Sequence, residues 1–381
     1  MGTKSPFQEV ADLIKESGGE AIKECYQCGT CSATCPWRDY ITFSPRRMFQ
    51  ESRLGLTDFE SNALWRCVTC NKCVQRCPRG VPIIDLMRAL RRSVIGMGIA
   101  EVPPALSGAL RNLSATGNPM GEPSENRNSW ADGLEIKPFD STKEYLFFPC
   151  CVTAYDPTMK DVVRSTARVL SAAGVDFGIL DGIGCCGESA RKAGDEALFQ
   201  QLARSNAQLF KQYQVEKIIV NSPHCYQTLK HEYPELESHF EVIHIGQLIP
   251  DLIDEGRLTL SKTIERKITY HDPCYLGRHN GIYEEPRKLI KAIPGVEFLE
   301  MESARSESLC CGGGGGRIWM ETLRNERFCE DRLKQAVATG ADSLVTACPY
   351  CLSNFKDSAL NQGLSDNYSI MDISELIAQA L

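Results

Sequence analysis

The sequence contains no uninterrupted run of about 20 apolar residues, which is the length that a membrane-spanning helix requires. Residues 1–6 also lack the apolar core of a secretory signal. We therefore expect a protein with no direct membrane span that stays in the cytoplasm, a compartment in which thiols remain reduced. Such a protein would serve a membrane only through a partner.

Two nucleotide-binding patterns are missing as well. Without a G-x-G-x-x-G fingerprint, a flavin or nicotinamide on this polypeptide is not expected. Five glycines at 312–316 are not closed by the Gly-Lys-Ser/Thr of a phosphate loop, so we expect their backbone to approach a cofactor or substrate closely. Basic residues are not in excess either. The net charge of -7 argues against binding to nucleic acid.

Cysteine is the residue that the sequence has in unusual number, with 19 among 381 residues. Eight cysteines form two copies of the pattern C-x-x-C-x-x-C-x-x-x-C-P, namely Cys25, Cys28, Cys31 and Cys35, then Cys67, Cys70, Cys73 and Cys77. This run holds two 4Fe-4S cubanes in bacterial-type ferredoxins. Zinc is the alternative, but a zinc ion needs only four thiolates, so a third C-x-x-C step before Cys-Pro favours iron–sulfur clusters.

The spacing also predicts which cysteines share a cluster. Three cysteines at i, i+3 and i+6 converge on one cube, while the fourth precedes a proline that turns the chain toward the other cube. The expected ligand sets are therefore crossed. One cubane takes Cys25, Cys28, Cys31 and Cys77, and the other takes Cys67, Cys70, Cys73 and Cys35.

The chain divides into an N-terminal part, a linker and a repeated part. Residues 1–100 carry the cysteine runs within helical sequence, and 101–143 have the Gly, Pro and Asn chemistry of turns. From 144 onward, short apolar strands alternate with helices. We expect an α+β multidomain protein: a helical ferredoxin-like domain, then two α/β domains at 144–262 and 263–381, each with a small parallel sheet.

The two α/β domains follow the same order of strands and cysteines. The expected strands are 145–148, 175–180 and 217–221 in the first copy, and 268–270, 296–299 and 343–346 in the second. Each copy has a Cys-Cys-Gly signature after its second strand, at Cys185-Cys186-Gly187 and at Cys310-Cys311-Gly312. The cysteines thus follow the C-terminal ends of strands, where parallel sheets bind ligands.

This twin repeat, C-x(n)-C-C-G-x(n)-C-x-x-C, resembles the cysteine-rich (CCG) domains of the B-type subunit of heterodisulfide reductase, and the ferredoxin-like module resembles the C-type subunit. Together they resemble the fused arrangement of the D-type subunit. The iron–sulfur subunits of glycolate, lactate and glycerol-3-phosphate oxidoreductases share it more loosely. The double ferredoxin pattern alone is generic, but its combination with two Cys-Cys-Gly repeats is highly specific.

The resemblance implies a noncubane 4Fe-4S cluster held by five cysteines of one repeat. The second repeat supplies all five: Cys274, Cys310, Cys311, Cys348 and Cys351. In the first repeat, Ser222-Pro223-His224-Cys225 stands where the family has Cys-Pro-x-Cys. The thiols that remain at family positions are Cys151, Cys185, Cys186 and Cys225. With Cys150, Ser222 or His224 completing the set, they would hold a further iron–sulfur cluster or a zinc ion.

The resemblance implies an iron–sulfur electron-transfer subunit of a heterodisulfide-reductase-like complex, which passes electrons between the cubanes and the noncubane cluster and would reduce a disulfide. The alternatives are a non-catalytic relay between a flavoprotein or ferredoxin and a separate dehydrogenase or reductase, or the iron–sulfur subunit of a 2-hydroxy-acid or glycerol-3-phosphate dehydrogenase. The expected partners are a flavin-containing protein like the A-type subunit of heterodisulfide reductase, an electron-transfer flavoprotein or a ferredoxin, with other members of the complex. No residue is assigned a catalytic role.

Overall fold

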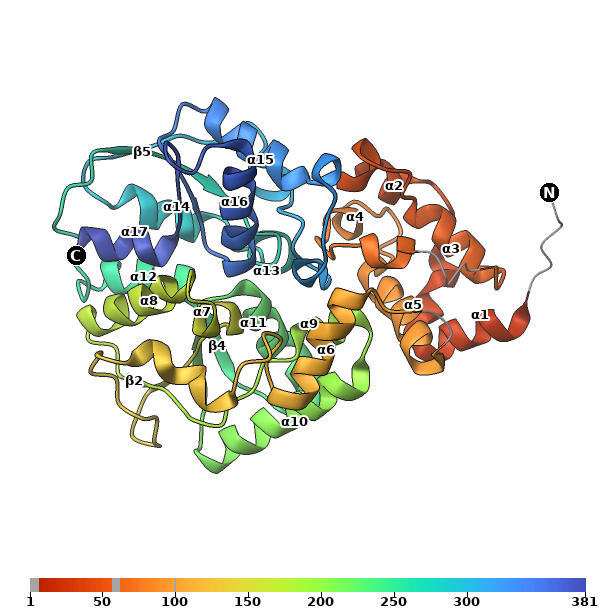
Figure 1. Ribbon diagram of the computed structural model, residues 1–381, viewed down its shortest axis with the longest axis horizontal. Helices are drawn as coiled ribbons and strands as arrows, with labels where there is room; N and C mark the ends of the chain where they lie inside the picture. Colours follow the sequence, from red (N-terminus) through yellow and green to blue (C-terminus); the bar gives the residue numbers. More distant parts are fainter. Residues whose placement is uncertain (1–6, 57–61, 99–100) are drawn as a thin grey trace.

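A computed structural model describes residues 7–56, 62–98 and 101–381 of the protein. The ferredoxin-like module lies at one end of the molecule, and the two α/β repeats lie side by side at the other (Figure 1). Among the helices of these described ranges, none combines the length and the apolar character needed to cross a membrane.

The ferredoxin-like module is built from short helices around the two cysteine runs. Its α-helices are α1 (Gln8–Ile14), α2 (Thr30–Thr34), α3 (Pro45–Arg53), α4 (Lys72–Gln75) and α5 (Ile83–Met97). Helix α3 begins at Ser44, whose hydroxyl accepts a hydrogen bond from the Arg47 amide, and Pro45 occupies its first turn. Helix α5 ends at Gly98, which takes the left-handed conformation typical of a helix end.

Each α/β repeat contains one four-stranded parallel sheet, in the order β2-β1-β3-β4 and β6-β5-β7-β8. The strands are β1 (Tyr145–Phe148), β2 (Phe177–Gly178), β3 (Lys217–Val220) and β4 (Glu241–His244), then β5 (Arg266–His271), β6 (Val296–Phe298), β7 (Ser343–Thr346) and β8 (Ser369–Asp372). The expected fold class is confirmed. Strands β4 and β8 extend each sheet beyond the three strands that the sequence pattern predicts.

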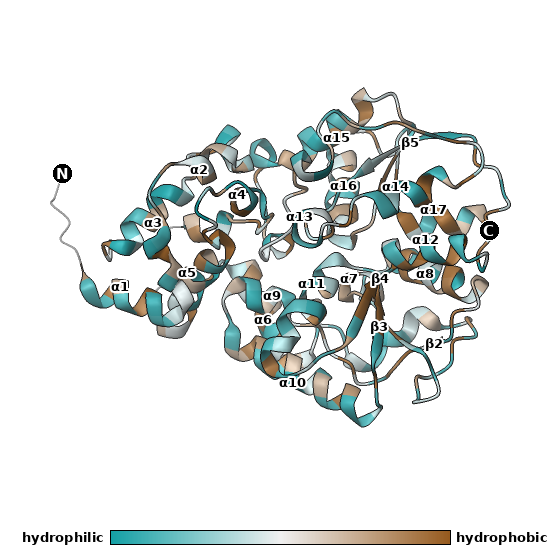
Figure 2. Ribbon diagram, turned by 180° about the vertical axis from the view of Figure 1, so that it is seen from behind, coloured by the Kyte–Doolittle hydropathy of each residue, from teal (hydrophilic) through white to brown (hydrophobic). Residues whose placement is uncertain are grey.

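Helices cover both sheets, whose central strands are largely buried, and Figure 2 shows hydrophobic residues on the strands labelled β3 and β4. In the first repeat they are α7 (Cys151–Tyr155), α8 (Lys160–Ala172), α9 (Glu188–Ala193), α10 (Glu196–Gln212), α11 (Pro223–Gln227) and α12 (Ile245–Asp254). In the second they are α13 (Gly277–Asn280), α14 (Glu284–Lys291), α15 (Phe328–Ala338), α16 (Pro349–Gln362) and α17 (Ile373–Ala380).

The two repeats pack against each other reciprocally. Helix α12, which follows the last strand of the first repeat, packs against α14 of the second, and α17 packs against α8. These pairs are equivalent, because α8 and α14 each follow the first strand of a repeat and α12 and α17 each follow the last. The interface therefore has the self-complementary character of a two-fold dimer within one chain.

Residues 101–143, expected as a linker, contain regular structure. Helix α6 (Pro104–Thr116) buries Leu106 and Leu113, and a 3-10 helix at Ser124–Ala131 buries Trp130. Leu106, Leu110 and Leu113 form an apolar stripe at helical spacing, which the surrounding prolines and glycines obscure in the sequence. The segment thus contributes to the core.

The glycine run packs directly against the ferredoxin-like module. A side chain added at Gly314 would place its Cβ 2.4 Å from the Val68 carbonyl oxygen, and one at Gly315 would lie 2.3 Å from that of Cys67. Only residues without a Cβ allow the two backbones to come this close. The run thus brings the second repeat against the second cysteine loop.

This contact gives a first prediction. Gly314→Ala should lower the free energy of unfolding by about 1–3 kcal/mol, because a methyl group cannot fit against the Val68 carbonyl without a backbone shift. Denaturant unfolding followed by circular dichroism measures this loss. Gly96→Ala is the matched control, since nothing lies within 4 Å of its Cβ position. Equal stabilities of the two variants would show that the glycine run tolerates side chains.

Candidate functional site

The first expected ligand set lines one surface cavity. Cys25, Cys28, Cys31 and Cys77 all contribute to its wall, together with the cationic side chains of Arg46 and Arg79. Cys28 is exposed and Cys31 is buried, so this set, which we call the outer ligand set, reaches the surface. The structure therefore brings together the four cysteines that the crossed spacing assigns to one cubane.

The other four cysteines of the module also lie near one another, and we call Cys35, Cys67, Cys70 and Cys73 the inner ligand set. Burial and the neighbouring thiols of Cys70 and Cys67 raise the pKa of Cys35. The same causes raise the pKa of Cys73 well above its ordinary value. Ionising several neighbouring thiols in a buried space is energetically unfavourable, because the thiolates repel one another and lose hydration. Coordination to a metal centre offsets this cost.

The backbone around both sets suits an anionic cluster. Gln27 and Gly29 in one loop have φ of 67° and 86°, and the matching Thr69 and Asn71 in the other have 51° and 67°. Left-handed residues that alternate with residues of negative φ are typical of concave arrays of amide groups, which favour negative charge. Left-handed Gln, Thr and Asn are strained, which is typical of functional loops.

The five cysteines of the second repeat converge from three chain segments, and we call them the second cysteine site. The Sγ atoms of Cys274 and Cys310 lie 3.9 Å apart, and those of Cys311 and Cys351 lie 3.2 Å apart. Although burial opposes it, hydrogen bonds from Cys351 and His224 lower the pKa of Cys348 to about 6. All five are buried free thiols, and thiolate is the form that binds metal.

His271 is an additional group at this site. One of its ring nitrogens and the thiols of Cys311 and Cys351 lie within 4.8 Å of one another. Its Nδ1 accepts a hydrogen bond from the Arg332 guanidinium at 3.3 Å, and burial lowers its pKa. The sequence places His271 near Cys274, but only the fold brings it to the Cys-Cys pair.

The inner ligand set and the second cysteine site touch. The Cys310 thiol lies close enough to Cys70 to lower the pKa of Cys70, although burial opposes this shift. Arg278 lies at the same junction: its Nε donates to the Cys70 carbonyl at 2.7 Å and its Nη1 to the Ser308 carbonyl at 2.8 Å. The Arg278 guanidinium also lies close to the Cys274 thiol. A buried cation thus lies between the two groups of thiols.

The first repeat also assembles five thiols, Cys150, Cys151, Cys185, Cys186 and Cys225, which we call the first cysteine site. Cys186 and Cys225 Sγ lie 3.8 Å apart. A hydrogen bond to Cys150 is the main cause that raises the pKa of Cys225, so Cys150 lies within the group. Arg127 donates to Cys151 Sγ at 3.3 Å. The buried Ser222 hydroxyl has no hydrogen-bond partner in the described ranges.

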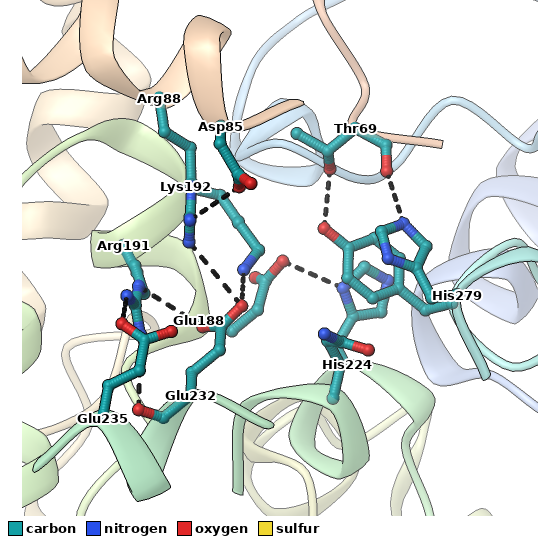
Figure 3. A network of polar contacts seen from close by, with 12 residues as sticks. Thr69, Asp85, Arg88, Glu188, Arg191, Lys192, His224, Glu232, Glu235 and His279 are labelled. Carbon is teal, nitrogen blue, oxygen red and sulfur yellow. Dashed lines mark hydrogen bonds and ion pairs between the residues drawn. The ribbon is translucent and has the colours of Figure 1, made fainter. Parts of the chain in front are cut away.

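His224 joins the two cysteine sites. Its Nδ1 lies 3.0 Å from the Glu188 carboxylate (Figure 3), its ring stacks on Tyr275, and the tilted Tyr350 ring lies 4.3 Å away between centroids. Despite burial, the Glu188 charge and Cys348 raise the pKa of His224 well above its ordinary value. His224 therefore lies between the two cysteine sites, and its Nδ1 is paired with the Glu188 carboxylate.

The buried cations around the inner ligand set and the two cysteine sites fit iron–sulfur clusters. Arg91, Arg127 and Arg278 are almost fully buried, and the structure pairs none of them with a carboxylate in the described ranges. Each instead lies close to a cysteine of one of the groups: Cys67, Cys151 and Cys70 respectively. Buried cations without carboxylates require nearby negative charge, and thiolate-bound clusters supply it.

Comparisons with known proteins agree with this chemistry. The family described as "Cysteine-rich domain" matches residues 145–230 and 268–356, and the family described as "4Fe-4S dicluster domain" matches 19–81. An "EtfAB:quinone oxidoreductase" of Syntrophomonas wolfei is 34% identical over 84% of this chain and 47% of the relative. The chain thus spans about half the length of that protein.

A relative of matching length is the D-type subunit of the dihydromethanophenazine:CoB--CoM heterodisulfide reductase of Methanosarcina mazei. It is 30% identical over 100% of this chain and 99% of the relative. A crystal structure of a hypothetical protein from Helicobacter pylori covers 98% of this chain and 75% of its own, with a TM-score of 0.53 and 11% identity. The last likeness concerns the fold alone.

The first cysteine site gives the second prediction. Cys150→Ser should lower its metal content, because a hydroxyl is a weaker soft-metal ligand than a thiolate and Cys150 lies against Cys225. Ser222→Ala should leave the metal content unchanged. Iron and zinc are quantified per chain after anaerobic purification. Loss of metal from the Ser222 variant alone would assign the ligand role to the serine instead.

Proposed function

The chain belongs to the family of heterodisulfide reductase D-type subunits, and on that premise we propose that it is an iron–sulfur electron-transfer subunit of a heterodisulfide-reductase-like complex. The outer and inner ligand sets would each hold a 4Fe-4S cubane, and the second cysteine site would hold a noncubane 4Fe-4S cluster. Such clusters supply one-electron carriers whose potentials depend on hydrogen bonds, charge and exposure. The first cysteine site would hold a further iron–sulfur cluster or zinc.

One observation carries this proposal: the inner ligand set is in contact with the second cysteine site. Cys70 and Cys310, which lie 240 residues apart in the chain, are close enough for their thiols to interact. Arg278 fixes both segments by donating to the carbonyls of Cys70 and Ser308. This arrangement supports electron exchange between the module and the second repeat without any large movement.

The outer ligand set is where we propose that a partner docks. Cys28 is exposed, and Arg46 and Arg79 line the same cavity, so the surface suits a partner with acidic groups. A flavin-containing subunit or an electron-transfer flavoprotein is the proposed partner. The relative named EtfAB:quinone oxidoreductase supports the second of these.

Reduction of a disulfide at the second cysteine site is a second candidate function. Cys311 lies on the wall of a cavity that opens to solvent, so a small molecule could approach this site. Splitting one disulfide into two thiols consumes two electrons and two protons. The name of the Methanosarcina relative supports this candidate. Production of free thiol from a disulfide by the reduced protein would distinguish it from a simple relay.

Cys28→Ser gives the third prediction. It should remove one cubane and leave the other clusters, because Cys28 lines only the outer cavity. Iron content should fall, and electron paramagnetic resonance of the reduced protein should lose the interaction between two cubanes. Cys329→Ser is the matched control, because this thiol shares a hydrogen bond with Ser358 and belongs to none of the four thiol groups. An unchanged iron content in the Cys28 variant would show that the outer ligand set does not hold a cubane.

The order of transfer gives a fourth prediction. Cys73→Ser disrupts the inner ligand set alone, so it should slow reduction of the second cysteine site after mixing with a reduced flavoprotein. Freeze-quench paramagnetic resonance follows the signal of that site over time. If its reduction is as fast in the variant as in the parent protein, electrons do not pass through the inner set.

A further inference from the structure

A cavity of about 400 Å³ lies between the ferredoxin-like module and the second repeat. Trp37, two residues after Cys35, contributes one wall, and Phe328 and Trp319 contribute others. Cys311 and Gly312 form part of the lining. The cavity therefore adjoins both the inner ligand set and the second cysteine site, and its volume is that of a site for a small organic molecule.

Arg317 is the cation of this cavity that lacks a carboxylate partner in the described ranges. Its residue is only 7% exposed. Its Nη2 donates to the Thr322 hydroxyl and, at 3.2 Å, to the Glu321 carbonyl. Its Nε is buried and has no hydrogen-bond partner within 7–56, 62–98 and 101–381. The guanidinium also lies 5.6 Å from the centre of the Trp37 ring, which leaves it held in place but not neutralised.

The other charges around the cavity are already balanced or exposed. Arg66 pairs with Glu326, and Arg327 pairs with Asp357. The side chain of Glu321 belongs to an exposed residue, and only its backbone carbonyl engages Arg317. The Glu326 carboxylate also acts on Arg317 from nearby, but its ion pair is with Arg66, so Arg317 has no direct ion pair in the described ranges.

Two further cations increase this imbalance. Burial, followed by the nearby guanidinium groups of Arg66 and Arg91, lowers the pKa of Arg317 to about 10. Arg317 is still a cation at neutral pH. A buried guanidinium beside two others is costly unless an anion joins it, so the arrangement favours binding of a negative group.

We propose that this cavity binds a small organic anion, with the carboxylate on Arg317 and an apolar or aromatic body against Trp37, Trp319 and Phe328. The guanidinium fork matches a carboxylate in charge and geometry. The aromatic walls select a ligand with apolar surface over a small inorganic ion. The bound molecule would lie beside Cys311, and so against whatever the second cysteine site holds.

This inference goes beyond electron transfer and does not depend on it, since Arg317 and the aromatic walls require no particular metal. The probe is benzoate, and benzamide is its uncharged counterpart of the same shape. Isothermal titration calorimetry on the full, cluster-loaded chain should detect benzoate and not benzamide. Equal binding of both probes, or of neither, would overturn the proposal.

Arg317→Gln should weaken benzoate binding about tenfold or more, because it removes a charge-assisted hydrogen bond. Arg324→Gln is the matched control: Arg324 lies on the same loop, outside the cavity lining, and donates to the Asn361 carbonyl. Arg317→Lys keeps the charge and should retain part of the affinity. If the Gln variant does not fold, the lysine variant and the comparison with benzamide still test the site. Benzoate affinity that is unchanged in the lysine variant and equal to that of benzamide would contradict the proposal.

Benzoate should also shift the paramagnetic resonance of the second cysteine site, since the cavity includes Cys311. Iron content is measured on the same samples. Loss of iron without loss of benzoate binding would count against the electron-transfer proposal alone. Normal iron and spectra with no benzoate binding would count against the anion site alone.

Discussion

The structure depends on one buried guanidinium, that of Arg91 on α5. It is fully buried and donates to four backbone carbonyls, at Leu64 and Cys67 in the ferredoxin-like module, Lys192 in the first repeat and Gly315 in the second. A cation in such a place is tolerable only if the carbonyls and a nearby negative group compensate it. Cys67 lies close enough to do so. One side chain therefore links three domains to the charge of a proposed cluster ligand.

The same junction explains why the two repeats are not equivalent, although they pack with two-fold character. The glycine run lets the second repeat approach the Cys67 and Val68 backbone, and Arg278 then bridges its cysteines to Cys70. The first cysteine site approaches the second through His224, which pairs with Glu188 in the polar network of Figure 3. The second cysteine site is thus the one in direct contact with the module, and the first is reached across an aromatic stack.

Several features were predictable because their signals are local. The parallel strands and their repeat follow from short apolar runs, and the grouping of Cys25, Cys28, Cys31 and Cys77 in one cavity agrees with a spacing rule. Strands β4 and β8 and helix α6 were not predicted. Their apolar residues are few or lie among prolines and glycines, and their burial depends on distant partners. The glycine run was expected to approach a cofactor or substrate, but it approaches the backbone of Cys67 and Val68 instead.

The sequence by itself determined the cysteine chemistry, the repeat and the family, because ligand type and spacing are properties of a few neighbouring residues. Only the tertiary structure decided which thiols meet across domains. It placed Cys70 near Cys310, Cys150 within the first cysteine site, and Arg317 on the wall of the cavity that Cys311 also lines. Contacts of this kind join segments up to 240 residues apart. They depend on how whole helices and loops pack, and no local periodicity or motif predicts that packing.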